Sequence, residues 1–241
     1  MKKPVSLILA FGLFTVLLPV KNASADRRSY AWTYEYQTTP KGMTELEYYV
    51  TTEAPDTSES NINTWKHQLE LEYGLTSRWD IGMYQMWKHK NTVSGSTTEY
   101  DGFKLRTKYR IGDKNQFLLD PLLYFEYIRD DDFSKPNVGE VKLVLSKDIE
   151  DFNISYNQIA ERNLEKEGKT DHGYATGVSY RFSHEFKLGL ESKGDYSAEK
   201  YAAGPTAAFA TKRFWVSFGA VFGLNERTDD VDTRMIVGVP F

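Results

Sequence analysis

Hydrophobic and polar residues alternate along most of the chain. In residues 65–73, Trp65, Leu69 and Tyr73 fall on one face, and the charged or polar residues between them fall on the other. Because side chains of a β-strand point alternately to opposite faces, this period of two predicts a strand. The same alternation recurs in residues 103–110, 174–182, 214–224 and 234–241. The pattern predicts an all-β fold in one domain.

The connections between the predicted strands alternate strictly between short and long. Short links such as residues 74–78 and 183–185 are separated from one another by longer polar links. The long links are residues 53–63, 89–99, 130–137, 163–172, 194–200 and 225–232. Transmembrane β-barrels have short turns at one end and longer loops at the other. Six long loops predict a closed antiparallel transmembrane β-barrel of about twelve strands over residues 43–241, with ten or fourteen as the next options.

Residues 30–37 also read as a strand, which would be a thirteenth. Its apolar face carries Tyr30, Trp32, Tyr34 and Tyr36. Single-chain bacterial barrels have even numbers of strands, so this N-terminal part, residues 26–42, needs another place. It lies inside the lumen, lies at the periplasmic rim, or joins the barrel while a weaker strand drops out. The weakest strand is residues 201–210, because Gly204-Pro205 interrupts it and proline cannot donate to a ladder.

The two ends of the chain predict export and membrane insertion. Lys2 and Lys3 precede an apolar run over residues 4–20, and Ala23-Ser24-Ala25 follows it. This pattern predicts a signal peptide over residues 1–25, cut after Ala25; the alternative is an uncleaved membrane anchor. Phe241 ends the last predicted strand, as in barrels that the barrel-assembly machinery inserts. We therefore expect the cell outer membrane of a Gram-negative bacterium, with its lipid and lipopolysaccharide, as the surroundings.

Several motifs carry a resemblance to known families. They are Pro40-Lys41-Gly42 with Glu45-Leu46-Glu47, Glu72-Tyr73-Gly74-Leu75-Thr76-Ser77-Arg78-Trp79-Asp80-Ile81-Gly82, Asp120-Pro121-Leu122-Leu123-Tyr124-Phe125-Glu126-Tyr127 and Leu143-Val144-Leu145-Ser146-Lys147-Asp148-Ile149. Together they resemble a family of uncharacterised bacterial outer-membrane β-barrels. The first two are also loosely similar to transporters grouped with a phenol-degradation (MetA) pathway. The resemblance, over roughly residues 30–160, implies an outer-membrane location and transport, and it supplies no catalytic or binding residues.

Composition narrows the function further. The chain has no cysteine, which excludes a thiol nucleophile and a cysteine-ligated metal. It has 34 acidic against 30 basic residues, a net charge of −4, which argues against nucleic acid as a partner. Mean hydropathy is −0.54, which is compatible with a membrane barrel because half of each strand faces a polar interior. No spacing indicates a metal or cofactor site, so we expect neither.

One predicted strand carries a row of cations on its polar face. Lys104, Arg106, Lys108 and Arg110 would attract anions if this face lines the lumen. Alternatively, they pair with acidic residues on the neighbouring strands, because opposite charges across a ladder stabilise it. The acidic residues are Glu70 and Glu72 on one side and Asp120 and Glu126 on the other. The candidate lumen-lining residues are Lys104, Arg106, Lys108, Arg110, Glu70, Glu72, Glu126 and Arg181.

Aromatic residues make up 15% of the chain, and several stand near the ends of predicted strands. Such residues form girdles at the two membrane interfaces of a barrel. The candidates are Trp65, Trp79, Trp87, Tyr73, Tyr109 and Phe241.

These features predict a porin-like channel for passive diffusion of small polar or charged solutes, whose identity stays open. The first alternative is a closed barrel, filled by its own salt bridges, that acts as a structural or interaction protein without transport. The second is a soluble periplasmic β-protein, either a β-sandwich or a ligand-binding barrel. An enzyme of the rim-hydrolase type is a further alternative, but no Ser–His pair or other catalytic residue is marked by the sequence, and we expect no enzymatic activity.

Overall fold

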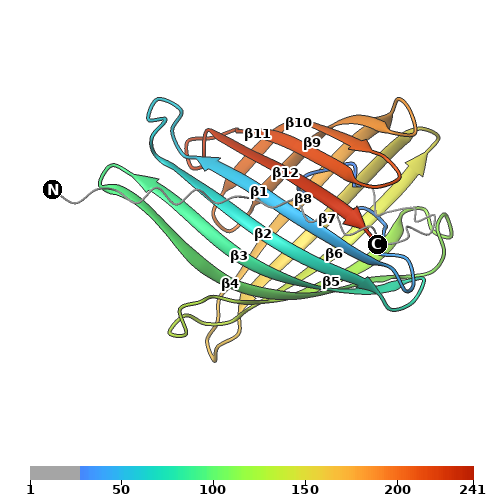
Figure 1. The fold of residues 1–241 in the computed structure, drawn as a ribbon, viewed down its shortest axis with the longest axis horizontal. Coiled ribbons are helices and arrows are strands. Elements are labelled where there is room, and N and C mark those ends of the chain that lie inside the picture. Colours follow the sequence, from blue (N-terminus) through green and yellow to red (C-terminus); the bar gives the residue numbers. More distant parts are fainter. Residues whose placement is uncertain (1–27) are drawn as a thin grey trace.

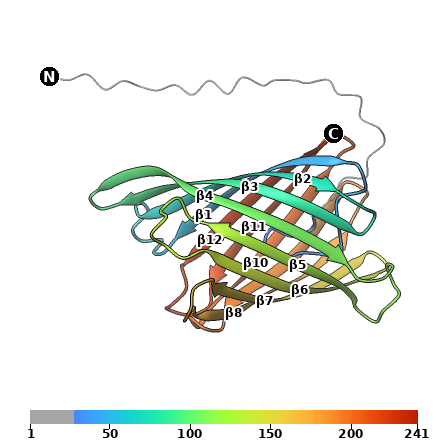
Figure 2. The same ribbon diagram turned by 90° about the horizontal axis from the view of Figure 1, so that it is seen from below.

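Residues 28–241 are described by a computed structural model, in which twelve antiparallel strands form a closed barrel (Figures 1 and 2). The strands are β1 (Thr44–Ala54), β2 (Asn63–Gly74), β3 (Trp79–Thr92), β4 (Gly95–Arg110), β5 (Asp120–Arg129), β6 (Val138–Ile149), β7 (Phe152–Asn163), β8 (Thr170–Arg181), β9 (Phe186–Asp195), β10 (Lys200–Ala210), β11 (Trp215–Gly223) and β12 (Val231–Pro240). The predicted fold class and strand number are thereby confirmed. The predicted signal peptide lies outside the described residues. Within them, no helix is long and apolar enough to cross a membrane.

The barrel closes where the last strand pairs with the first. Strands β12 and β1 lie side by side, with a continuous register from Glu45↔Pro240 to Ala54↔Val231 (Figure 1). Beyond this register, the Phe241 N–H donates to the Thr44 carbonyl at 2.8 Å, and the Thr44 N–H donates back at 3.1 Å. A closed ladder leaves no unpaired strand edge, which is the condition for β-structure in a bilayer.

The hydrophobic faces of the strands point outward. Leu69, Val178 and Phe218, from three different strands, are 38%, 39% and 46% exposed. Their polar neighbours Glu70 and Ser217 are fully buried. In a β-sandwich the apolar face would be the buried one. The sandwich form of the soluble alternative is therefore wrong, and the interior of the barrel is its polar side.

The predicted loop over residues 89–99 is instead part of a long hairpin. Strands β3 and β4 have 14 and 16 residues and continue past the other strands to a turn at Val93 and Ser94 (green in Figure 1). Their pairing runs from Trp79↔Tyr109 to Thr92↔Gly95, with a shift in register between Met86 and Trp87. The polar composition that indicated a loop is compatible with a two-stranded ribbon that has solvent on both faces.

Strand β10 forms although it contains Pro205. Gly204 and Pro205 keep their partners Glu191 and Leu190 on β9. On the β11 side the pairing stops at Ala203↔Phe222 and resumes at Thr206↔Gly219. The missing N–H of proline therefore interrupts only one of the two ladders, and the barrel needs no thirteenth strand to replace β10.

Residues 28–40, which we call the N-terminal segment, form no strand. This segment is drawn in blue in Figure 1. Most of its side chains are buried, and it forms hydrogen bonds with side chains and backbone carbonyls of the barrel. The prediction of a strand over residues 30–37 is therefore wrong. The aromatic side chains of this segment pack into the barrel wall instead. Trp32 clusters with Ala202 and Val221, and Tyr34 and Tyr36 cluster with Leu122 and Tyr124.

Candidate functional site: the lumen and its N-terminal segment

The N-terminal segment folds back on itself inside the barrel. The N–H and the hydroxyl of Ser29 both donate to the Glu35 carboxylate, each at 2.7 Å. These two bonds close a loop over residues 29–35. The ammonium of Lys187 on β9 adds a hydrogen bond to the Ser29 hydroxyl at 2.8 Å. The loop is thus closed by its own residues and also held to the wall.

The tip of this loop binds one carboxylate through three successive backbone N–H groups. Ala31 donates to Glu191 Oε2 at 2.8 Å, and Trp32 and Thr33 each donate to Oε1 at 2.9 Å. Successive N–H groups that converge in this way form a favourable site for an anion. Glu191 projects from the middle of β9 and is buried, so it fixes the depth of the loop in the lumen.

Other strands hold the rest of the segment. The Tyr30 hydroxyl donates to the Asn153 carbonyl at 2.9 Å, and Asn157 on the same strand accepts from the Tyr34 N–H at 2.6 Å. The Tyr36 hydroxyl donates to the Gly112 carbonyl at 2.7 Å. Near its end, the Thr39 N–H donates to Asp80 at 2.9 Å and its hydroxyl donates to Glu72. Contacts to β2, β3, β7 and β9 show that the segment crosses the interior.

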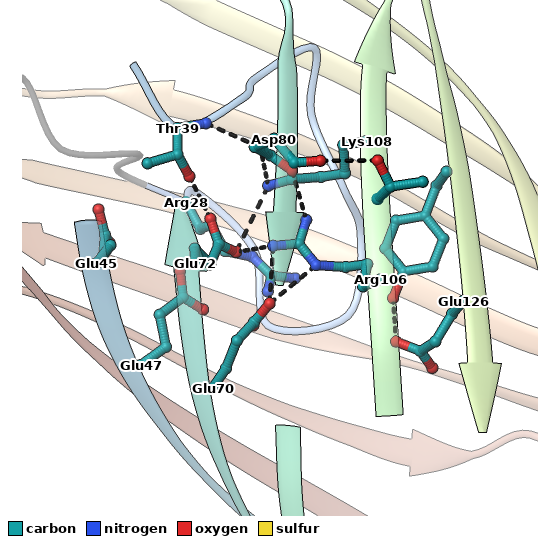
Figure 3. A network of polar contacts seen from close by, with 12 residues as sticks. Arg28, Thr39, Glu45, Glu47, Glu70, Glu72, Asp80, Arg106, Lys108 and Glu126 are labelled. Carbon is teal, nitrogen blue, oxygen red and sulfur yellow. Dashed lines mark hydrogen bonds and ion pairs between the residues drawn. The ribbon is translucent and has the colours of Figure 1, made fainter. Parts of the chain in front are cut away.

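Opposite charges meet on the inner wall between β2 and β4 (Figure 3). We call Glu70, Glu72, Asp80, Arg106 and Lys108 the buried charge cluster. The Arg106 guanidinium lies 2.7 Å from Glu70 and 3.2 Å from Asp80, and it also pairs with Glu72. The Lys108 ammonium is 3.5 Å from Asp80 and 3.7 Å from Glu72. All five side chains are at most 3% exposed, so each charge depends on its partners rather than on water.

A glycine makes this arrangement possible. Gly82 on β3 lies between Glu72 on β2 and Arg106 on β4 in the register. A Cβ at Gly82 would lie 2.5 Å from a Glu70 oxygen and 2.8 Å from Arg106 Nη2. The absence of a side chain therefore lets Arg106 reach across one whole strand to the carboxylates on the next.

Two further carboxylates extend the acidic side of this wall. Glu45 and Glu47 on β1 are the register partners of Glu72 and Glu70. The Tyr49 hydroxyl contacts both Glu47 and Glu70 and accepts from Arg28 at 3.1 Å. Oxygens of Glu47, Glu70 and Glu72 lie within 4.8 Å of one another, a spacing that a metal ion could bridge. Because Arg106 already supplies positive charge there, we assign no metal to the group.

The eight candidate lumen-lining residues all come from inward-facing positions, but they differ in surroundings. Six of them form buried or half-buried ion pairs. Four belong to the buried charge cluster, and the other two are Lys104 and Glu126, which pair at 2.9 Å. Arg110 contacts the Ser77 carbonyl and the Tyr36 ring, and Arg181 pairs with Asp151 at 2.9 Å. Both line an open cavity at the short-turn end. That any of the eight contacts a passing solute stays a prediction.

Asp80 and Glu191 are central to the interior and were not among the candidates. The sequence does contain a signal for Glu191. Leu188 and Leu190 fall on the outer, exposed face of β9, so the alternation of side chains places Glu191 inside. Asp80 follows Trp79 at the start of β3, and only the register places it opposite Lys108. Asp120, expected beside the cationic row, instead lies 4.0 Å from Lys147.

The six candidate girdle residues lie on the outer surface, each between 37% and 46% exposed. Tyr73, Trp79, Tyr109 and Phe241 lie near the short-turn end, where Trp79 is opposite Tyr109. Trp65 and Trp87 lie nearer the long-loop end. This placement is compatible with two interfacial belts, and contact with lipid stays a prediction.

Cavities open on both sides of the N-terminal segment. At the short-turn end a cavity of about 580 Å³ is lined by Ser29, Glu35 and Tyr36 together with Arg110 and Arg181. At the long-loop end two cavities of about 450 and 500 Å³ share Glu53, Lys66 and Arg234, and Trp32 lines the first. The segment therefore lies between water-accessible space at one end and water-accessible space at the other.

Solved structures with this architecture are known. The KdgM porin superposes with a TM-score of 0.58 at 11% identity, covering 82% of this chain and 99% of its own. The chain has the fold of small outer-membrane porins. The NanC porin gives 0.52 at 13% identity (82% and 98% covered), and the translocator domain of the autotransporter NalP from Neisseria meningitidis gives 0.54 at 10% (86% and 91%). KdgM has also been solved in complex with disordered oligogalacturonate. No family model and no curated protein matches the sequence.

Proposed function

We propose that this protein is a porin-like channel of the outer membrane that passes small polar or charged solutes by passive diffusion. The N-terminal segment narrows its lumen and limits the flux. Support comes from the fold shared with the KdgM and NanC porins, from charged residues on the inner wall, and from the apolar outer face. The observation that carries the proposal is the pair of water-accessible ends on either side of a segment whose side chains and backbone are held to the inner wall by hydrogen bonds.

The apolar outer face of the barrel also supports a location in a membrane. Exposed Leu69, Val178 and Phe218 belong to a barrel wall that a hydrocarbon layer would cover, which requires insertion into a membrane. We propose the outer membrane, reached after export and removal of the predicted signal peptide. Outer-membrane lipid, lipopolysaccharide and the barrel-assembly machinery are then its partners.

A second candidate function is a closed barrel that acts through its loops and passes no solute. The observation that favours it is the filling of the lumen at mid-depth, where the N-terminal segment binds Glu191 on one wall and contacts Glu72 and Asp80 on the other. Barrels of modest diameter can be filled by side chains. This candidate and the channel differ in whether the segment leaves a continuous path.

Recording in planar lipid bilayers separates the two. We expect the purified full-length protein to give small, discrete conductance steps. A variant that lacks residues 29–39 should give steps several-fold larger, because the cavities at the two ends of the barrel then join. Wild-type protein that is silent while the deletion variant conducts would establish the closed barrel. Silence of both, with both still running as folded, heat-modifiable bands on gels, would contradict the channel.

A further inference from the structure

Arg234 is a lumen cation whose hydrogen bonds go to neutral groups. It projects inward from β12 and lines both cavities of the long-loop end. Its Nε–H donates to the Thr51 hydroxyl at 2.9 Å, and Nη1–H reaches the Ala31 carbonyl at 3.4 Å. Both acceptors are neutral. Among residues 28–241, no carboxylate lies within ion-pair distance of this guanidinium.

Three lysines that line the first cavity together with Arg234 are already paired. Lys66 lies 2.5 Å from Glu53, and Lys193 lies 2.6 Å from Asp232. Lys142 also lines the first cavity and lies 2.9 Å from Glu140. The remaining charges of this cavity, on Asp195, Lys200 and Asp229, belong to the ends of β9 and β10 and to the loop before β12, at its mouth. Of the described cations that line the cavity inside its mouth, Arg234 is therefore the one with no carboxylate within ion-pair distance. A half-buried guanidinium of this kind favours an anion strongly.

The groups around Arg234 hold its guanidinium in place and indicate the chemistry of the rest of the ligand. Its Cζ lies 5.4 Å from the centre of the Trp32 ring, a distance typical of a cation–π contact. The wall of the 450 Å³ cavity also includes Ile159, Tyr174 and Tyr201. Apolar and aromatic walls with a small number of placed polar groups are typical of sites for small organic molecules, and the volume falls in their range.

We propose that Arg234 binds the carboxylate of a small organic anion whose apolar part lies in the 450 Å³ cavity. The forked N–H groups of arginine match a carboxylate in two parallel hydrogen bonds. This inference deepens the proposed function by naming the class of solute, and it rests on that function only for the route by which the anion enters. The binding itself is a property of the folded barrel.

Binding is best measured by calorimetry on the full-length protein in detergent micelles, with no membrane current involved. The probe is benzoate, a compact carboxylate with an apolar ring, and benzamide is its neutral counterpart. We expect saturable binding of benzoate, at least tenfold weaker binding of benzamide, and at least tenfold loss in Arg234→Gln. Arg234→Lys, which retains the charge, should lose less. Arg213→Gln, in the turn between β10 and β11, is the matched control and should bind as the wild type does.

The outcomes separate this inference from the channel. Equal benzoate affinity in the wild type and in Arg234→Gln would overturn it, as would the absence of binding to folded wild-type protein. Inorganic phosphate that binds as tightly as benzoate would overturn the organic part of the ligand. A protein that binds benzoate through Arg234 but carries no current would contradict the channel and leave the site in place.

Discussion

Arg106 is the residue on which the charge balance of the inner wall depends. It faces three carboxylates, on Glu70, Glu72 and Asp80, and its own side chain is fully buried. Removal of one partner from a buried ion-pair network leaves the other charges without compensation, which costs more than the network contributes when intact. Lys108, which lies 3.5 and 3.7 Å from Asp80 and Glu72, carries one positive charge and cannot alone balance three carboxylates.

We expect Arg106→Met to lower the free energy of unfolding by about 3–5 kcal/mol, because methionine keeps the volume but not the charge. Urea unfolding in detergent or lipid, followed by tryptophan fluorescence, measures this. Arg181→Met is the matched control, since the Arg181–Asp151 pair is 48% exposed on each side and such pairs contribute about 0–1 kcal/mol. Equal losses in the two variants would contradict the assigned difference in burial.

At this scale the sequence predicted the partners only in part. Alternation places Lys104, Arg106 and Lys108 on one face, and acidic residues on adjoining strands made pairing an open alternative. The structure has Arg106 paired two strands away, past Gly82, and Asp80 as a further partner. These contacts depend on the register of three strands at once, which no single segment of sequence contains.

The N-terminal segment shows that a local alternation of side chains does not by itself decide whether a segment forms a strand. Its alternating aromatics match a strand, yet its N–H groups bind Glu191 and Asn157, which are more than 120 positions away in the chain. A strand would need a neighbouring strand to pair with, and the closed ladder offers none. The sequence left a lumen position as one of three options, and only the distant acceptors distinguish it from the others.

Glu191 should determine whether this element stays ordered. In Glu191→Ala, the N–H groups of Ala31, Trp32 and Thr33 lose their acceptor. A hydrogen bond to a charged group contributes about 1.5–3 kcal/mol, so the exchange rates of these amides should rise at least tenfold. Hydrogen–deuterium exchange with mass spectrometry measures this on the peptide that contains them. Glu199→Ala, in an exposed loop, should leave the exchange unchanged; unaltered exchange in both variants would show that Glu191 does not hold the loop.

The architecture of the whole molecule was the most predictable level. Alternation gave the faces of the strands, and the regular change between short and long connections gave an even strand number and antiparallel pairing. These features depend on period and spacing, which are properties of the chain itself. Residues 234–241 continue the outward pattern of apolar side chains up to Phe241, and strand β12 closes the barrel by pairing with β1.

Closure between β1 and β12 should dominate the resistance of the barrel to heat. Val237 lies within this seam, paired with Tyr48 on one side and Val216 on the other. Val237→Pro removes a ladder N–H there, and a loss of about 2–3 kcal/mol corresponds to a fall of about 5–10 °C in the unfolding midpoint. Heat-modifiable migration on gels over a temperature series measures it, and Val237→Ala is the control with its N–H intact. Identical midpoints for the two would argue against the seam as the weak point.

The contacts of the N-terminal segment also set an order on assembly. Residues 29–34 are synthesised before any part of the wall, but the strands they bind, β7 and β9, come more than a hundred residues later. Contacts of such large separation in sequence form slowly. Because its partners lie on the wall, we expect this part of the chain to take its place after those strands have formed, so that a hollow barrel would precede the filled one.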